Sequence, residues 1–516
     1  MKQTPITTGL SIAASAALLF CGQCVAAIDA GNARQLFLDD QVVDSLDHVS
    51  RIFHQAVKSA SNPVLVPVKP WEGKNVAVGT VIYDEQERLF KMWYAGLEIH
   101  FQAPPPPFDQ YENLLRAAKY TEEFHLCYAT SKDGIHWDRP ELGLVDYHGS
   151  TKNNMVHIET AGGKPVFIAS LFKDVREKNP QRRYKGVTYW KDQKGRFGVG
   201  VYFSADGLRW SPYEGNPAIF GTSDVHQLLG WDERIRKYVG YFRPGHGPAQ
   251  PDYERLSPPA GKQRVRTIGY SVSDDFEHWT PIEAALIPDE QDPVDAQFYG
   301  MPAMKYEGHY IGFPWVFRTN EITHVPQLVF SRDGRRFSRT PGRGDFIPLG
   351  PTGAFDDANV YSSRPVVHDG KIWVYYSGGR WRGMQDLLES EAKGRDAIGL
   401  ATLPLDGFAS LQAGPNPGVL TTKALRFQGS RLVVNMEASV KGYGVDETTS
   451  LAVEVLDESG QPIPEYSQKR ADRFSRSSLS QVITWSGRSD VRALAGKPVR
   501  LRFHLRNVKL YSFQFL

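Results

Sequence analysis

Cysteine is scarce in this chain, and its scarcity excludes a fold held together by disulfides. Three cysteines occur in 516 residues, at Cys21, Cys24 and Cys127. The first two lie in an N-terminal segment that we expect to be removed, so the mature chain keeps one thiol and its core must supply the stability. Cys127 lies in an apolar strand pattern, which is typical of a buried and inert thiol.

The sequence also lacks the long apolar runs and the one-sided charge that mark other classes of protein. No membrane-length apolar run follows the N-terminal segment, and the mean hydropathy is -0.39. Lys and Arg total 60 against 58 Asp and Glu, which argues against broad electrostatic binding to nucleic acid. We therefore expect no nucleic-acid partner and no membrane span. The length predicts two or more domains.

Several signatures of catalysis are absent too. The sequence has no zinc-type spacing of His and Cys, no Gly-rich phosphate loop and no Gly-x-Ser-x-Gly motif. We therefore expect no required cofactor and no catalytic metal. Asp oxygens suit Ca²⁺, so a structural calcium ion is compatible with the sequence.

The N-terminus reads as a secretory signal peptide that spans residues 1–27. Lys2 supplies a positive charge, Leu10–Phe20 form a short apolar core, and Val25-Ala26-Ala27 offers small residues for cleavage. We expect cleavage near Ala27 and a secreted or periplasmic protein.

A short motif recurs along the chain and predicts the architecture. Each copy ends a strand, makes a tight Ser-x-Asp turn and begins another strand with an aromatic residue. The clear copies are YATSKDGIHW (Tyr128–Trp137), YFSADGLRW (Tyr202–Trp210), YSVSDDFEHW (Tyr270–Trp279) and VFSRDGRRF (Val329–Phe337). We interpret these turns as structural connections at the rim of a repeated unit.

A second motif, a strand rich in aromatic and β-branched residues, occurs five times and counts the units. Its copies begin at Arg88, Arg182, Arg236, Gly308 and Lys371. Each unit reads as four antiparallel strands, A to D, which predicts a five-bladed β-propeller. We assign residues 28–413 to it and expect residues 34–44 to add a strand that closes the ring.

The pattern changes after the Pro/Gly-rich linker AGPNPG (Ala413–Gly418). Short alternating strands from residue 429 onward predict a β-sandwich domain over residues 414–516. The predicted fold class is therefore all-β, a five-bladed propeller followed by a C-terminal sandwich.

The candidate site follows from the A strands, which line the central channel. Steps of about the same length back from the second motif land near Asn75, Asp224, Asp295 and Asp357, so these polar groups are expected to converge at one end of the channel. Residues two positions further on point the same way. They add His226, Gln297 and Tyr299, with Arg364 close by.

Two of these residues have an equally good structural interpretation. His226 fits a satisfied inner-strand histidine, and Arg364 fits an ion pair with Asp357. The long B–C loops should lie on the same face as the starts of the A strands, and they bring Glu98 toward it.

The segment NPVLVPVKPWEGKNVAVGTVIYDEQERLFKMWYAG (Asn62–Gly96) resembles the opening blade of the five-bladed propeller glycoside hydrolases, the group of invertases, arabinanases and β-mannoside phosphorylases. The C-terminal sandwich resembles the accessory module of the invertases. The resemblance implies that Asp224 and Asp295 act as base or nucleophile, stabiliser or acid, with Asp40 or Asp39 a further candidate. The Asn-Asp-Pro, Arg-Asp-Pro and Glu-Cys motifs of the invertases are absent.

Three functions fit the sequence. The first is a secreted glycoside hydrolase that acts on polysaccharide-derived glycans, with carbohydrate as its partner. The second is a non-catalytic carbohydrate-binding propeller, and the third is a glycoside phosphorylase. The general acid stays open between an Asp, Glu98 and His226.

Overall fold

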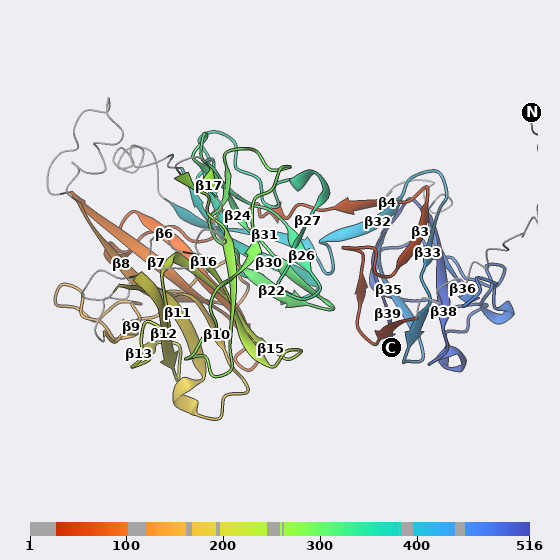
Figure 1. Ribbon diagram of the computed structural model, residues 1–516, viewed down its shortest axis with the longest axis horizontal. Coiled ribbons are helices and arrows are strands. Elements are labelled where there is room, and N and C mark those ends of the chain that lie inside the picture. The colour runs from red at the N-terminus through yellow and green to blue at the C-terminus, as the bar shows by residue number, and fades with distance from the viewer. Residues whose placement is uncertain are drawn as a thin grey trace, which may run out of the picture.

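The computed structural model describes residues 27–101, 120–160, 168–191, 197–244, 259–260, 263–380, 382, 396–438 and 449–516. In these residues the chain is all-β, apart from single-turn 3-10 segments, and forms two lobes (Figure 1). The 3-10 segments are η1 (Pro70–Glu72), η2 (Pro180–Arg182), η3 (Pro341–Arg343), η4 (Pro464–Tyr466) and η5 (Arg492–Leu494). No helix of the described part is both long and apolar enough to cross a membrane. Residues 1–26 of the expected signal peptide lie outside the described residues.

The larger lobe consists of five antiparallel blades, the first three of which follow the chain in order. Blade 1 consists of β6 (Asn75–Asp84), β7 (Leu89–Phe101) and β8 (Tyr120–Ser131). Blade 2 consists of β9 (His157–Ile158), β10 (Ile168–Lys173), β11 (Tyr184–Lys191), β12 (Phe197–Ser204), β13 (Arg209–Pro212) and β14 (Ile219–Phe220). Blade 3 consists of β15 (Thr222–Asp232), β16 (Lys237–Pro244), β19 (Ile268–Ser273) and β20 (Glu283–Leu286). A small hairpin, β17 (Pro259–Ala260) and β18 (Gln263–Arg264), precedes β19.

Blade 4 is split across its middle because prolines interrupt its ladders. Its upper part consists of β21 (Ala296–Phe298), β24 (Trp315–Arg318) and β25 (Thr323–Pro326). Its lower part consists of β22 (Ala303–Tyr306), β23 (His309–Gly312), β26 (Val329–Ser331) and β27 (Ser338–Arg339). Pro302, Pro314 and Pro326 lie at the breaks and have no N–H to donate to a neighbouring strand.

Blade 5 closes the ring. It consists of β28 (Asn359–Ser362), β29 (Val366–His368), β30 (Lys371–Gly379), β31 (Ala397–Pro404) and, from the N-terminal part of the chain, β5 (Val57–Lys58). β6 of blade 1 contacts β10 on one side and β29 and β30 on the other. Apolar clusters fill each of the five junctions between neighbouring blades, and the junction of blades 5 and 1 buries Cys127. The predicted five-bladed propeller is confirmed.

The smaller lobe is a sandwich of two sheets that both ends of the chain build. One sheet consists of β1 (Ile28–Gly31), β3 (Val43–Asp47), β33 (Gly418–Thr422), β34 (Leu425–Phe427), β36 (Ser450–Asp457) and β38 (Val499–Arg506). The other consists of β2 (Gln35–Leu36), β4 (Ser50–Phe53), β32 (Ala409–Ala413), β35 (Leu432–Ala438), β37 (Ser478–Val482) and β39 (Val508–Phe515). A single apolar core lies between the two sheets.

This pairing corrects the predicted role of the N-terminal segment. Residues 34–44 contribute to β2 and β3, which pair with sandwich strands β39 and β33, so they do not close the propeller ring. Instead, β5 closes the ring by pairing with β31 of blade 5. The predicted boundaries of 28–413 and 414–516 therefore do not follow the sheets.

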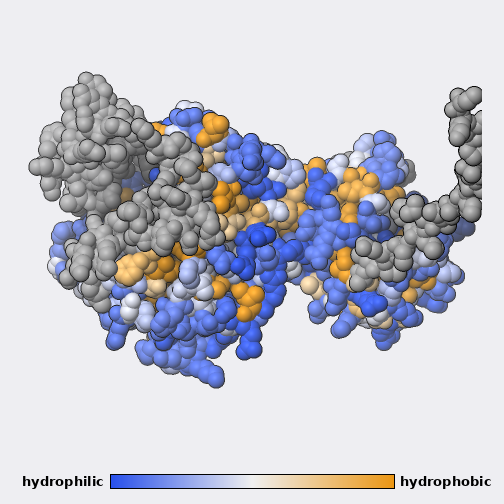
Figure 2. All heavy atoms as spheres, viewed as in Figure 1, coloured by the Kyte–Doolittle hydropathy of each residue, from blue (hydrophilic) through white to orange (hydrophobic). Residues whose placement is uncertain are grey.

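The two lobes meet at a narrow waist (Figure 2) where Asp406 is buried. Its carboxylate accepts hydrogen bonds from Tyr306 of blade 4 and, at 2.7 Å, from Ser512 of the sandwich. Asn435 donates a third bond at 3.1 Å, and Arg34 forms an ion pair at 3.3 Å. The buried carboxylate of Asp406 thus links blade 4 to sandwich residues from both ends of the chain.

Candidate functional site

The A strands begin at the same end of the propeller. Their first residues lie opposite residues at or near the ends of the B strands in the pairs Asn75 and Leu97, Ile168 and Thr188, Thr222 and Pro244, Ala296 and Arg318, and Asn359 and Gly379. The B–C connections therefore leave from this end, as the sequence indicates. We call this end of the channel the mouth.

Asp224 lies at the mouth on β15 and contacts the guanidinium of Arg243 at the end of β16. The Asp224 side chain is 52% exposed, whereas the Arg243 side chain is 4% exposed. Arg243 lies over the ring of Tyr299, 4.2 Å from its centroid, and donates a bond of 3.3 Å to the Tyr299 carbonyl oxygen. A buried cation therefore holds an accessible carboxylate next to an aromatic face.

Gln297 and Tyr299 both take part in this arrangement from blade 4. Arg266 donates a hydrogen bond of 2.6 Å to Gln297 Oε1, and its guanidinium lies 5.6 Å from the Tyr299 centroid. The edge of His324 meets the Tyr299 ring at 4.9 Å, and His324 Nδ1 lies 2.8 Å from Asn359 Oδ1. Burial lowers the pKa of His324 to about 3, so this imidazole is neutral at neutral pH.

Tyr361 of blade 5 is buried within the electrostatic influence of two carboxylates, Asp396 and Asp224. Burial raises the pKa of Tyr361 well above its ordinary value, and the charges of Asp396 and Asp224 raise it further. Tyr189 of blade 2 is influenced in the same way, because burial and the charge of Asp224 raise its pKa to about 12. The charge of Asp224 thus acts on side chains of blades 2, 3 and 5.

His226 is buried behind the mouth and is neutral at neutral pH. Its side chain is buried against the Phe242 ring, and its Nε2 lies 3.1 Å from Thr222 Oγ1. Burial lowers the pKa of His226 to about 3. The burial and these contacts favour the structural interpretation of His226, and a neutral imidazole does not suit a general acid at neutral pH.

Asp295 begins the inner strand of blade 4 but contacts a neighbouring turn. Its Oδ2 accepts a hydrogen bond of 3.0 Å from the Asn320 backbone, and its carbonyl oxygen accepts one of 3.2 Å from Thr319. Its predicted partner, Asp224, lies on β15 of blade 3. Their joint action stays a prediction.

Asn75 and Asp357 occupy mouth positions with local partners. Asn75 is buried beside Asp396, whose N–H lies 3.4 Å from Asn75 Oδ1. Asp357 Oδ2 accepts a bond of 2.7 Å from the Gly353 backbone. Asp357 Oδ1 is buried and has no hydrogen-bond partner among the described residues.

Glu98 lies at the end of β7 and belongs to a cluster within blade 1. Its Oε1 lies 2.9 Å from His125 Nε2 and accepts a bond of 3.1 Å from the Tyr147 hydroxyl. Only 14% of the Glu98 side chain is exposed. The part of the B–C connection that follows β7 lies outside the described residues.

Two predicted site residues lie away from the mouth. Asp40 follows β2, is 70% exposed, and pairs with Arg51 of sandwich strand β4, so the structure does not bring it to the inner strands. Arg364 lies farther along the channel, where it donates a bond of 3.1 Å to the Leu229 carbonyl oxygen. It does not form the expected ion pair with Asp357.

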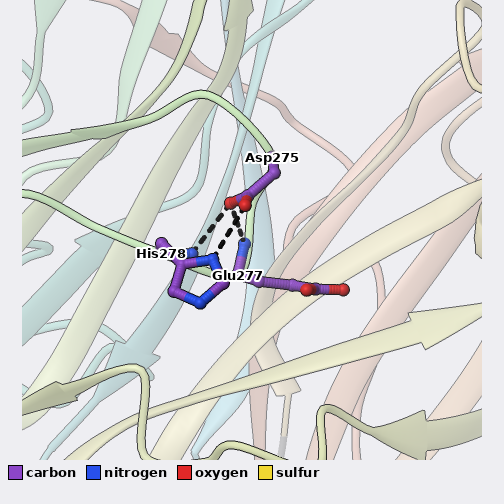
Figure 3. Close-up of side chains that lie close together, drawn as sticks. All are labelled: Asp275, Glu277 and His278. Atoms are coloured by element: carbon purple, nitrogen blue, oxygen red, sulfur yellow. Dashed lines mark hydrogen bonds and ion pairs between the residues drawn. The ribbon is translucent and has the colours of Figure 1, made fainter.

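A group of acidic and histidine side chains at the rim has a structural explanation (Figure 3). Asp275, Glu277 and His278 lie close enough to share a metal ion, but they form one of the recurring Ser-x-Asp turns. Asp275 Oδ1 accepts the backbone N–H groups of Glu277 and His278, and Oδ2 lies 2.8 Å from His278 Nδ1. Arg209 takes the place of His278 in blade 2 and pairs with Asp206 at 2.8 Å. A cationic side chain therefore suffices for this turn, and the predicted structural role is confirmed.

Several mouth residues escape the sequence analysis: Tyr189, Arg243, Arg266, His324, Asn359 and Asp396. Most lie at the ends of B strands or the starts of C strands, which meet at the mouth just as the A strands do. The signal was available for Arg243, which ends the strand motif RKYVGYFRP (Arg236–Pro244). Asp396 follows a long loop, so counting steps from a strand motif does not reach it.

No family model and no curated protein matches the chain. Among solved structures, a β-1,2-mannobiose phosphorylase from Listeria innocua matches with 14% identity over 68% of this chain and 97% of its own, at a TM-score of 0.44. A glycosyl hydrolase from Bacteroides ovatus matches with 14% identity over 68% of this chain and 94% of its own, at a TM-score of 0.41. An N-acetylgalactosamine deacetylase from F. plautii matches with 15% identity over 74% of this chain and 97% of its own, at a TM-score of 0.36. The first two are of the kind that the sequence resembles. The fold described above rests on the strand pairing of this chain.

Proposed function

We propose that the mouth binds a carbohydrate and cleaves a glycosidic bond by hydrolysis. The observation that carries the proposal is the exposed carboxylate of Asp224, which Arg243 holds beside the aromatic face of Tyr299 at the mouth. Asp396 supplies a second acid near the same inner strands, since its backbone lies beside Asn75. Sugar rings stack on aromatic faces, and their hydroxyl groups bond to carboxylates and guanidinium groups. Paired carboxylates are the groups that glycoside hydrolysis needs.

The surroundings of the two carboxylates suggest different roles for them. Arg243 contacts Asp224 and favours its charged form, which suits a base, a nucleophile or a stabiliser of positive charge. The second carboxylate would donate a proton to the leaving oxygen. We assign this role to Asp396, and Asp295 is the alternative that the sequence indicates.

A screen of glycans tests the proposal. The purified protein is incubated with a panel of polysaccharides and oligosaccharides, and released reducing sugar is measured. Hydrolysis of at least one glycan supports the proposal. Binding of a glycan without turnover, measured by calorimetry, would instead support the non-catalytic carbohydrate-binding propeller. The same assay in the presence of a Ca²⁺ chelator tests whether turnover depends on a structural calcium ion.

Phosphorolysis is the second candidate, because Arg243 and Arg266 both lie over the Tyr299 ring. Guanidinium groups bind phosphate well. Hydrolysis is preferred because both groups already have partners, Asp224 and Gln297. The same assay with and without inorganic phosphate separates the two reactions, since a phosphorylase releases a sugar phosphate and depends on phosphate.

Export is part of the proposal. The composition of residues 1–27 supports a cleaved signal peptide. N-terminal sequencing of the protein from the periplasm or the medium is expected to start near Ile28, and an intact Met1 in the cytoplasm would contradict it.

A further inference from the structure

Arg364 crosses the central channel of the propeller. It lies between β28 and β29 in the inner part of blade 5, and its Nη1 donates a bond of 3.1 Å to the carbonyl oxygen of Leu229 in blade 3. Blades 3 and 5 are not neighbours in the ring, so the side chain spans the channel. The site therefore lies on the propeller axis and is distinct from the mouth.

Two hollows of about 310 and 530 Å³ meet at Arg364. Both are lined by Ile82, Tyr83 and Leu229, which belong to the later halves of inner strands. The larger hollow also reaches Asp84 and Asp174, at the ends of their strands. The hollows thus open toward the face opposite the mouth.

The cation of Arg364 has no carboxylate partner among the described residues, whereas most of the acids that line the larger hollow have a cation of their own. Asp84 pairs with Lys173 at 2.8 Å, Asp174 with Lys185 at 3.2 Å, and Glu233 with Arg176 at 3.7 Å. Glu85 lines the same hollow with no cationic partner among the described residues, and it is not part of the lining of the smaller hollow.

The smaller hollow has only cationic charges in its lining. Arg364 and Lys305 contribute these charges, and the rest of the lining comes from Val81, Ile82, Tyr83, Leu229, Met304, Pro365 and Val366. Lys305 pairs with Asp232 at 2.8 Å, and Asp232 is not part of the lining. A half-buried guanidinium in such surroundings has five N–H donors and uses one of them on Leu229.

We propose that this hollow binds a small oxyanion, such as a carboxylate or a sulfate, between Arg364 and Lys305. The planar guanidinium matches two oxygens of such an anion, and the ammonium group adds a second charge. Burial lowers the pKa of Arg364, in agreement with the absence of a carboxylate partner among the described residues. The bound anion would link blades 3, 4 and 5 through the channel.

Calorimetric titration with acetate, sulfate and phosphate tests the site and distinguishes the kinds of oxyanion. Wild-type protein is expected to bind at least one of these anions at one saturable site. Arg364→Gln is expected to weaken the affinity for that anion by about 10-fold or more, because the variant loses a charge-assisted hydrogen-bonded pair. Arg209→Gln is the matched control, because Arg209 is exposed and pairs with its own turn. Equal binding by wild type and Arg364→Gln would overturn the proposal.

A second measurement does not depend on any variant folding. Crystals of the wild-type protein are soaked in selenate, and the anomalous map is calculated. A peak within about 4 Å of the Arg364 guanidinium is expected, the distance of an ion pair. An empty channel at saturating selenate, together with no saturable binding of acetate, sulfate or phosphate, would overturn the proposal. Sulfate also stabilises proteins in general, but that effect is not saturable and would be common to all variants.

Discussion

The hydroxyl of Tyr375 in blade 5 donates a hydrogen bond of 2.8 Å to the carbonyl oxygen of Gly134 in the rim turn of blade 1. The same relationship joins blades 1 and 2, where Trp93 donates to Gly207 at 2.7 Å, and blades 3 and 4, where Tyr241 donates to Gly334 at 2.7 Å. The Ser-x-Asp turn thus presents a carbonyl group to the B strand of the preceding blade. This explains why a turn and an aromatic strand recur together.

Removing the Tyr375 hydroxyl should therefore weaken the closure of the ring. We expect Tyr375→Phe to lower the free energy of unfolding by about 1–2 kcal/mol, because the buried Gly134 carbonyl loses its partner. Denaturant unfolding measures the change. Tyr202→Phe is the control, since the buried Tyr202 hydroxyl has no hydrogen-bond partner among the described residues. A loss no larger than that of the control would contradict a role for this bond.

Asp406 should be the most sensitive single residue of the waist. We expect Asp406→Ala to lower the free energy of unfolding by about 3–5 kcal/mol, because Arg34 and Tyr306 keep their buried polar groups but lose the charge between them. Asp490→Ala removes an exposed acid that pairs with Arg492 and should change the free energy of unfolding far less. Similar effects of the two variants would show that the waist does not depend on this charge.

Acid should destabilise the propeller through Asp84. Lys173 and Lys91 donate to its carboxylate and hold the pKa of Asp84 well below its ordinary value of 3.8, against the effect of burial. A lowered folded pKa gives stability that is present above the unfolded value and is lost as the pH falls through and below about 4. The difference in melting temperature between the wild type and Asp84→Asn should therefore shrink steadily as the pH falls below about 4, and it should vanish only below the lowered pKa of the folded state. A constant difference from pH 7 to pH 2 would contradict this linkage.

Variants of the mouth carboxylates test the proposed chemistry. We expect Asp224→Asn and Asp396→Asn each to lower turnover of a glycan substrate by about 10²-fold or more, with little change in melting temperature. Asn keeps the shape of the side chain and removes its charge. Asp295→Asn is the comparison, because the amide oxygen can still accept the bond from Asn320. If turnover fell for Asp295→Asn but not for Asp396→Asn, the role of proton donor would be assigned to Asp295 instead.

The blades and their number could be read from the sequence, because both depend on local patterns. Alternation with period two, a turn that Asp and Gly favour, and five aromatic strands are each set within about ten residues. The Ser131 hydroxyl and the Asp133 carboxylate satisfy the backbone of their own turn, so no distant residue is needed to form it. The position of Asp224 at the mouth followed from the same strand count.

The tertiary structure alone decided the partners that lie far apart in the chain. β3 pairs with β33, although some 370 residues separate them, and no local pattern distinguishes a strand of the sandwich from one that closes a ring. The same holds for individual side chains. Strand alternation could place His226 on an inner strand but could not show that Phe242 and Thr222 bury it. It could not show that Arg364 extends across the channel to Leu229, because that contact depends on how five blades close around one axis.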